Sequence, residues 1–173
     1  ETIDFDAAVD WLRKNKPRFA ARVGVFGLSM GAAVACASMP GHPDLRCAVV
    51  ESPFSGYEGV VRRWAWNNLR VPYFPLVMIT LRLLRLRVGD SRIDSFSPVE
   101  TVDRIAPRPL FVIGGTMDDL MPEYDVRRVF DAAREPKQLW MVAGARHAKC
   151  RGTAGLEYET RVNRVIDHIR GHL

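Results

Sequence analysis

The segment that decides the fold is residues 22–39, which read Arg-Val-Gly-Val-Phe-Gly-Leu-Ser-Met-Gly-Ala-Ala-Val-Ala-Cys-Ala-Ser-Met. Residues 23–28 form a short apolar run without polar alternation, which is typical of a β-strand covered on both faces. Residues 32–39 are small and favour a helix, which Pro40 and Gly41 then end. The sequence therefore predicts a strand that turns directly into a helix.

The same alternation of strand and helix patterns continues along the chain. Three further short apolar runs are predicted strands, at residues 46–50, 110–113 and 138–142. Helical patterns lie at residues 2–15, 123–134 and 156–172. Strands that alternate with helices indicate an α/β fold with a mostly parallel sheet flanked by helices.

Length and composition are those of one globular domain. The chain has 173 residues, of which 47% are hydrophobic and 26% charged, so one core is expected and residues 1–173 are interpreted as a single domain. The longest uncharged apolar stretch, residues 71–81, contains two prolines and is too short to span a membrane. The three cysteines are odd in number and widely spaced, which favours free thiols and a cytoplasmic location.

Residues 56–97 interrupt the rhythm and are predicted to be an insertion. The net charge of the chain is +5, and this segment holds seven arginines against three acidic residues, so most of the basic character belongs to it. One interpretation is a helical lid over a substrate, lined by Trp64, Trp66, Phe74 and Leu83. The alternative is a long helical excursion with an ordinary core and solvated arginines.

Basic residues in that segment also bear on the choice of partner. A basic helical surface is compatible with peripheral contact to an anionic membrane. Nucleic-acid binding is not expected, because the aromatic residues of the segment lie within an apolar stretch.

The turn between the first strand and its helix carries the first candidate for chemistry. It reads Gly27-Leu-Ser29-Met-Gly31. A sharp turn from strand to helix lifts a serine hydroxyl out of the sheet, and small flanking residues avoid clashes there. The start of the helix then lies beneath any negative charge that develops on a reacting oxygen.

Two further residues complete an ordered set. Asp118 lies just beyond the strand at residues 110–113, at the end of the sheet where open α/β folds assemble their sites. His147 follows the last strand on a loop of small residues. Ser29, Asp118 and His147 thus occur in the chain order of a known type of catalytic triad.

Three neighbouring residues are weaker candidates. Asp119 is interpreted as a turn or capping acid. Glu51, at the tip of the second strand, is an alternative acid for the triad. Cys150 lacks the strand-to-helix turn that activates a nucleophile and is interpreted as a plain thiol.

With these motifs the sequence resembles the α/β-hydrolase superfamily, particularly its lidded serine hydrolases of the esterase, lipase, thioesterase and serine-aminopeptidase-like branch. The resemblance runs along essentially the whole chain. It also rests on the segments Ser52-Pro-Phe54, Ser97-Pro98 and Ile105-Ala-Pro-Arg-Pro109.

The resemblance implies a role for each site residue. Ser29 would be the nucleophile, His147 the general base and acid, Asp118 the orienting carboxylate, and Met30 the donor of one oxyanion-hole N–H. The implied reaction is cleavage of an ester or thioester of a hydrophobic acyl group through an acyl-serine intermediate. No metal or organic cofactor is expected. A peptidase of the same fold and a non-enzymatic partner-binding module are the alternatives.

The sequence departs from the family at its beginning. Members of the superfamily carry an upstream half with several strands and a second oxyanion donor, so this chain is expected to match the C-terminal portion of such a hydrolase. The strand at residues 23–28 would then be an edge, and an apolar edge invites pairing. A companion chain or self-association along this strand is therefore expected.

Overall fold

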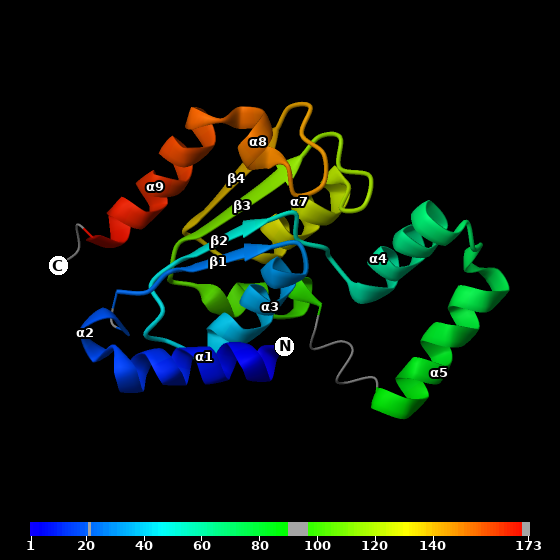
Figure 1. Ribbon diagram of the computed structural model, residues 1–173, viewed down its shortest axis with the longest axis horizontal. Helices are drawn as coiled ribbons and strands as arrows, with labels where there is room; N and C mark the ends of the chain where they lie inside the picture. The colour runs from blue at the N-terminus through cyan, green and yellow to red at the C-terminus, as the bar shows by residue number, and fades with distance from the viewer. Residues whose placement is uncertain (21, 90–96, 171–173) are drawn as a thin grey trace.

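The computed structural model describes residues 1–20, 22–89 and 97–170. At its centre is a parallel four-stranded sheet in the order β1-β2-β3-β4 (Figure 1). The strands are β1 (Val25–Leu28), β2 (Ala48–Glu51), β3 (Leu110–Gly115) and β4 (Lys137–Val142). In register, Leu28 lies beside Glu51, and Glu51 beside Ile113. Because the strands are parallel, the segments that follow them emerge at one end of the sheet.

Helices cover both faces of the sheet (Figure 1). One face packs against α1 (Thr2–Asn15), α3 (Met30–Ser38) and α7 (Glu123–Ala132), with Val50 and Val112 among the strand residues buried there. The opposite face packs against α8 (Cys150–Ala154) and α9 (Leu156–Arg170) through residues that include Val49 and Phe111. Neighbouring residues in a strand point to opposite faces, so the uninterrupted apolar runs supply both cores at once.

The first strand differs from the others in its cover. Phe26 and Leu28 are 54% and 41% exposed, whereas every residue of β2 is buried. Phe26 pairs with Val49, so its side chain faces the layer that α9 covers farther along the sheet. Within the described residues, β1 is thus an edge strand with one face partly open. The apolar pattern of residues 23–28 is that of a strand covered on both faces, but the edge position of β1 and its exposed side chains agree with the expectation that this strand is an edge.

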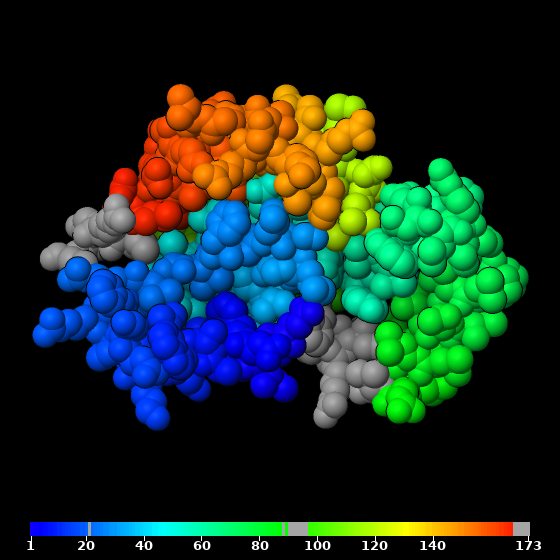
Figure 2. All heavy atoms as spheres, in the orientation of Figure 1, coloured from blue at the N-terminus to red at the C-terminus, as the bar shows by residue number. Residues whose placement is uncertain are grey.

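The segment after β2 leaves the body of the protein. It contains α4 (Tyr57–Trp64), two short π-helical turns, η2 (Ala65–Leu69) and η3 (Tyr73–Val77), and α5 (Met78–Val88). Figure 2 shows its atoms as a lobe to the right of the sheet. The lobe has a small core of its own around Ala65, Val77 and Leu81. Of the predicted insertion at residues 56–97, residues 90–96 lie outside the described residues.

Most predicted elements are confirmed, with shifts of a few residues at their ends. The helix at residues 2–15 and the four strands are present. Two short helices were not expected, α2 (Pro17–Ala20) and α8. The helix predicted for residues 156–172 is α9, and the last two residues of that prediction lie outside the described part. Two 3-10 turns, η4 (Pro98–Glu100) and η5 (Val102–Ile105), lead back into β3.

Two kinds of feature are absent from the described part of the chain. No described helix combines the length and the apolar character needed to cross a membrane. Among the described side chains, no group of three or more His, Cys, Asp or Glu residues is placed to hold a metal ion.

Candidate active site

Ser29 lies at a sharp turn between β1 and α3. Its backbone has φ 54° and ψ −115°, a conformation that residues with a side chain rarely adopt and that proteins keep where the surroundings enforce it. The Ser29 N–H donates to the carbonyl of Glu51 (2.9 Å), and the carbonyl of Ser29 accepts the N–H of Ala32 (3.0 Å). One backbone bond therefore ties the turn to β2, while the other begins the helix.

Glycine at position 27 allows this turn to be tight. A Cβ atom at Gly27 would lie 2.4 Å from the carbonyl oxygen of Gly31 and 2.7 Å from the Cα of Ala32. Both neighbours are backbone atoms of α3, which cannot move aside as a side chain could. The helix can thus start directly against the strand only because Gly27 has no side chain.

His147 contacts the hydroxyl of Ser29. Its Nε2 lies 2.9 Å from Ser29 Oγ, although 118 positions separate the two residues. The loop that carries His147 connects β4 to α8 and packs on the end of β3: the Met117 N–H donates to the carbonyl of Ala145 (2.9 Å). At Gly115 a Cβ would lie 2.3 Å from that same carbonyl oxygen, so the loop rests directly on strand backbone.

Asp118 contacts the other nitrogen of the imidazole. Its Oδ2 is 2.9 Å from His147 Nδ1, and its side chain is fully buried. Its Oδ1 accepts the backbone N–H groups of Leu120 (3.1 Å) and Met121 (2.7 Å). Since a carboxylate only accepts hydrogen bonds, Nδ1 holds the proton and Nε2 presents a lone pair to the Ser29 hydroxyl. The structure therefore brings together the three residues that the sequence selected.

The remaining candidates lie near the hydrogen-bonded residues Ser29, His147 and Asp118. Met30 is the first residue of α3, so its N–H has no carbonyl four residues earlier in the helix to bond. Asp119 is exposed. Cys150 is buried, and burial raises the pKa of its thiol, with a further contribution from Glu51. Few thiolates would form at neutral pH, which fits the interpretation of Cys150 as a plain thiol.

Glu51 has a place that the sequence did not suggest. Its carboxylate is buried and accepts the N–H of Cys150 (3.1 Å) and the hydroxyl of Tyr158 (2.6 Å). Burial, followed by this hydrogen bond, raises the pKa of Tyr158. Both carboxylate oxygens of Glu51 thus bond to residues beyond His147, whereas Asp118 bonds to the imidazole itself. These contacts do not match the alternative in which Glu51 is the acid of the triad.

The four aromatic and aliphatic residues proposed to line a lid are largely exposed. Their exposed fractions lie between 49% and 70%, for Trp64, Trp66, Phe74 and Leu83. Trp66 lines a cavity of about 310 Å³ together with Arg62, Tyr73 and neighbouring residues of the lobe. The lining role of the four residues stays a prediction.

Arg63 on α4 contacts the loop that holds Asp118, which was not predicted from the sequence. One of the two interpretations of residues 56–97 leaves the arginines solvated, but the side chain of Arg63 is only 14% exposed. Its Nε donates to the carbonyl of Leu120 (2.7 Å), and its guanidinium pairs with the buried carboxylate of Asp125. The lobe is thus joined to the loop that holds Asp118. No local sequence pattern predicts the contact between Arg63 and Asp125, which are 62 positions apart.

Known proteins match most of the length of this chain. The uncharacterised protein YqkD of Bacillus subtilis is 27% identical over 160 residues, which are 91% of this chain and 52% of that protein. The uncharacterised protein MT2364 of Mycobacterium tuberculosis is 31% identical over 144 residues, or 83% of this chain and 44% of that protein. The chain therefore spans about half the length of these curated relatives.

Solved structures share its fold. Esterase Pf2001 of Pyrococcus furiosus matches with a TM-score of 0.74 and 25% identity, over 96% of this chain and 61% of that one. GrgF, an alpha/beta hydrolase of Penicillium sp. sh18, matches with a TM-score of 0.67 and 19% identity, over 99% and 71% of the two chains. This chain belongs to the α/β-hydrolase superfamily.

A family model gives a further comparison for this α/β hydrolase. The model of the X-Pro dipeptidyl-peptidase (S15) family matches residues 1–68. The matched part contains Ser29 and the first two strands, and it ends within the first part of the lobe. Asp118 and His147 lie beyond it.

Proposed function

We propose that this α/β hydrolase cleaves an ester or thioester of a hydrophobic acyl group through an acyl-Ser29 intermediate. The proposal rests on one observation, the hydrogen-bonded series from Ser29 Oγ to His147 Nε2 (2.9 Å) and from His147 Nδ1 to Asp118 Oδ2 (2.9 Å). A serine hydroxyl, an imidazole and a buried carboxylate in this order form the arrangement used for acyl transfer on several unrelated folds.

In this proposal each residue has one step. Ser29 Oγ attacks the acyl carbon while its proton passes to His147 Nε2, and the buried Asp118 carboxylate stabilises the imidazolium that forms. The Met30 N–H donates to the oxygen that becomes negative. His147 then gives its proton to the leaving alcohol or thiol as the bond to it breaks. Water, deprotonated by His147, releases the acid from Ser29 in the same way.

An apolar cluster near the turn supports a hydrophobic acyl group. Phe54 and Met121 are buried against Ala33 in the first turns of α3, and Val60 and Leu120 pack on them. Met121 belongs to the loop whose N–H groups hold Asp118. Apolar side chains are therefore present at the end of the sheet where the serine lies.

Two other candidates remain. The S15 match over residues 1–68 favours a peptidase of the same fold, whereas solved relatives such as Pf2001 and acetyl xylan esterase 1 of Thermoanaerobacterium are named as esterases. A non-enzymatic binding module is the alternative from another class. For the lobe, we propose the role of a lid over the acyl group, with the exposed arginines Arg70, Arg82 and Arg87 available for peripheral membrane contact.

Labelling with a fluorophosphonate tests the proposal. Intact mass should show one adduct, which Ser29→Ala abolishes and Ser52→Ala keeps. Ser52 is a matched control because it also follows a strand with a positive φ (51°), but its side chain is buried. Well-folded protein without any adduct would favour the binding module.

Turnover separates the ester and peptide candidates. With a nitrophenyl ester, Ser29→Ala or His147→Ala should lower kcat by about 10⁴-fold or more, because triad residues act as a unit. More than a tenth of the activity in either variant would remove that residue from the triad. Faster cleavage of an X-Pro nitroanilide than of nitrophenyl butyrate would favour the peptidase.

A further inference from the structure

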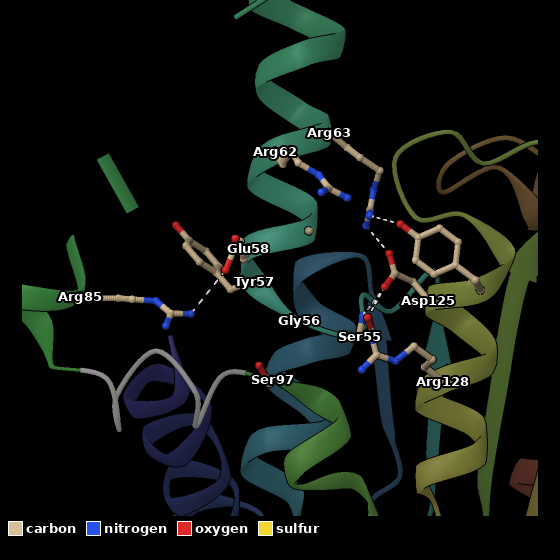
Figure 3. Close-up of a pocket in the computed structure, with 12 residues that line it drawn as sticks. Ser55, Gly56, Tyr57, Glu58, Arg62, Arg63, Arg85, Ser97, Asp125 and Arg128 are labelled. Atoms are coloured by element: carbon tan, nitrogen blue, oxygen red, sulfur yellow. Dashed lines mark hydrogen bonds and ion pairs between the residues drawn. The ribbon is translucent and has the colours of Figure 1, made fainter. Parts of the chain in front are cut away.

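A cavity of about 300 Å³ lies between the lobe and the body of the protein. Figure 3 shows residues of its walls: Tyr57, Glu58, Arg62 and Arg63 of α4, Arg85 of α5, Ser97, and Asp125 and Arg128 of α7. Four arginines line it, namely Arg62, Arg63, Arg85 and Arg128.

The carboxylates that line the cavity already have cationic partners. Asp125 pairs with Arg63 and also accepts the Ser55 hydroxyl. Glu58 lies 3.7 Å from Arg85 and also accepts the Tyr73 hydroxyl. Both acidic side chains are therefore engaged by groups of the protein itself.

Arg62 and Arg128 are left without an acidic partner. Within residues 1–20, 22–89 and 97–170, neither forms an ion pair with a carboxylate. They reach the cavity from different helices, α4 and α7, and no dashed line meets either in Figure 3. The guanidinium carbon of Arg62 lies 5.9 Å from the centroid of the Tyr73 ring.

Guanidinium groups that share a concave wall give it a positive potential, and a cleft with low-dielectric walls concentrates that field. A guanidinium presents its N–H groups as a planar fork that matches carboxylate and phosphate oxygens. We infer that this cavity binds an anionic group, a carboxylate or phosphate, carried by the substrate of the proposed hydrolase. A hollow between two helices suits one compact charged group better than it suits a flat lipid surface.

The cavity is joined to the proposed active site by consecutive hydrogen bonds. Arg63, in its wall, donates to the carbonyl of Leu120, and the N–H of Leu120 donates to Asp118. Asp118 in turn bonds to His147. An anionic group held beside Arg63 therefore lies next to the loop that positions the catalytic carboxylate. This inference rests on the proposed function and narrows it to esters or thioesters with a negative charge at one end.

Matched ester pairs test the inference in the full-length protein. Nitrophenyl butyrate, hexanoate and decanoate would be compared with the nitrophenyl monoesters of succinic, adipic and sebacic acids, which have the same chain lengths but end in a carboxylate. At one or more lengths the anionic ester should have the higher kcat/KM. Arg62→Gln/Arg128→Gln should reduce that preference at least about tenfold, chiefly through KM.

The control variant is Arg104→Gln/Arg164→Gln, which removes the same charge from two exposed positions away from the cavity. It should keep the preference for the anionic ester. An equal loss in both double variants, or no preference at any length in an active enzyme, would overturn the inference and leave the proposed function standing.

Calorimetry with inorganic phosphate gives a readout that does not need turnover. Binding should occur in the wild-type protein and in the control variant, and Arg62→Gln/Arg128→Gln should abolish it. Arginine-dependent phosphate binding by a protein that cleaves no ester would overturn the assignment of the cavity to a substrate. Binding to vesicles that contain phosphatidylglycerol, without phosphate binding, would overturn the inference and assign the arginines to a membrane surface.

Discussion

Arg63 of α4 and Asp125 of α7 form an ion pair in which the two side chains are only 14% and 3% exposed. Asp125 also accepts the N–H and the hydroxyl of Ser55, just beyond β2. The pair thus joins the start of the lobe to the body at the level of the proposed site. Removing one member of a buried pair costs more than the pair contributes, because the other charge stays buried alone.

Arg63→Ala should lower the free energy of unfolding by about 3–5 kcal/mol, since it leaves the Asp125 carboxylate without its cation. Arg127→Ala is the matched control, because Arg127 pairs with Glu123 on the same helix but in an exposed setting, where a loss below about 1 kcal/mol is expected. Denaturant unfolding measures both values. Equal losses of unfolding free energy in the two variants would show that burial of the Arg63–Asp125 pair does not affect its contribution to stability.

Asp118→Asn should reduce kcat on a nitrophenyl ester by about 10³ to 10⁴-fold, because an amide in contact with Nδ1 favours the wrong imidazole tautomer. Asp119→Asn should leave turnover nearly unchanged, since its side chain is exposed. Glu51→Gln should have an intermediate effect, through the positions of Cys150 and Tyr158. A larger loss in Glu51→Gln than in Asp118→Asn would mean that the acid is wrongly assigned.

Replacing residues 57–96 with a short Gly-Ser linker tests the lid. The replacement should be made in an Asp125→Asn background, so that loss of Arg63 does not leave a buried charge. The proposal expects a changed acyl-length profile and a smaller change in the rate on acetyl esters, which depend little on lid contacts. An unchanged length profile in the folded variant would contradict the lid, and Asp125→Asn alone is the control.

The exposed edge of β1 predicts association. The 173-residue chain on its own should form dimers or larger species, because Phe26 and Leu28 are exposed on a strand whose outer backbone groups lack a described neighbour. Phe26→Lys should shift it toward the monomer. Ile3→Lys, which also removes an exposed apolar side chain but from α1, serves as the control. Size-exclusion chromatography with light scattering decides, and a stable monomer of the unmodified chain would refute the prediction.

Thiol reactivity gives a pH test. All three cysteines are free, as the sequence predicted, and all three are buried. Burial raises the pKa of the Cys36 thiol to about 12. The thiolate is the reactive form, so native protein at pH 8 should react slowly with iodoacetamide, and the rate should still rise above pH 9. Unfolded protein should take up three labels quickly. Rapid labelling of a native cysteine at pH 8 would contradict the described burial.

The features that were predicted correctly depend on residues that are close together in the sequence. The apolar run before Ser29 and the small residues after it are sufficient to specify the strand, the turn and the helix. Asp118 and His147 could be selected because parallel strands bring the segments after them to one edge of the sheet.

The features that were missed depend on contacts between distant segments. Neither the pairing of Arg63 with Asp125 nor the bonds from Glu51 to Cys150 and Tyr158 leaves a local pattern. The exposure of Phe26 on an edge strand, in contrast, agrees with the expectation for residues 23–28. That expectation came from the family resemblance, because an apolar run by itself indicates only that a strand can be covered.

The contacts at Gly27 and Gly115 limit how this protein could be re-engineered. Each glycine lets one backbone segment rest on another, α3 against β1 and the His147 loop against β3. A methyl group at either position would force apart the segments that carry Ser29 and His147, whatever side chains surround them. Mutagenesis aimed at new substrates can therefore vary the surface of the lobe widely, while these two positions have to remain fixed. Selectivity and reactivity would then be separate design problems in one short chain.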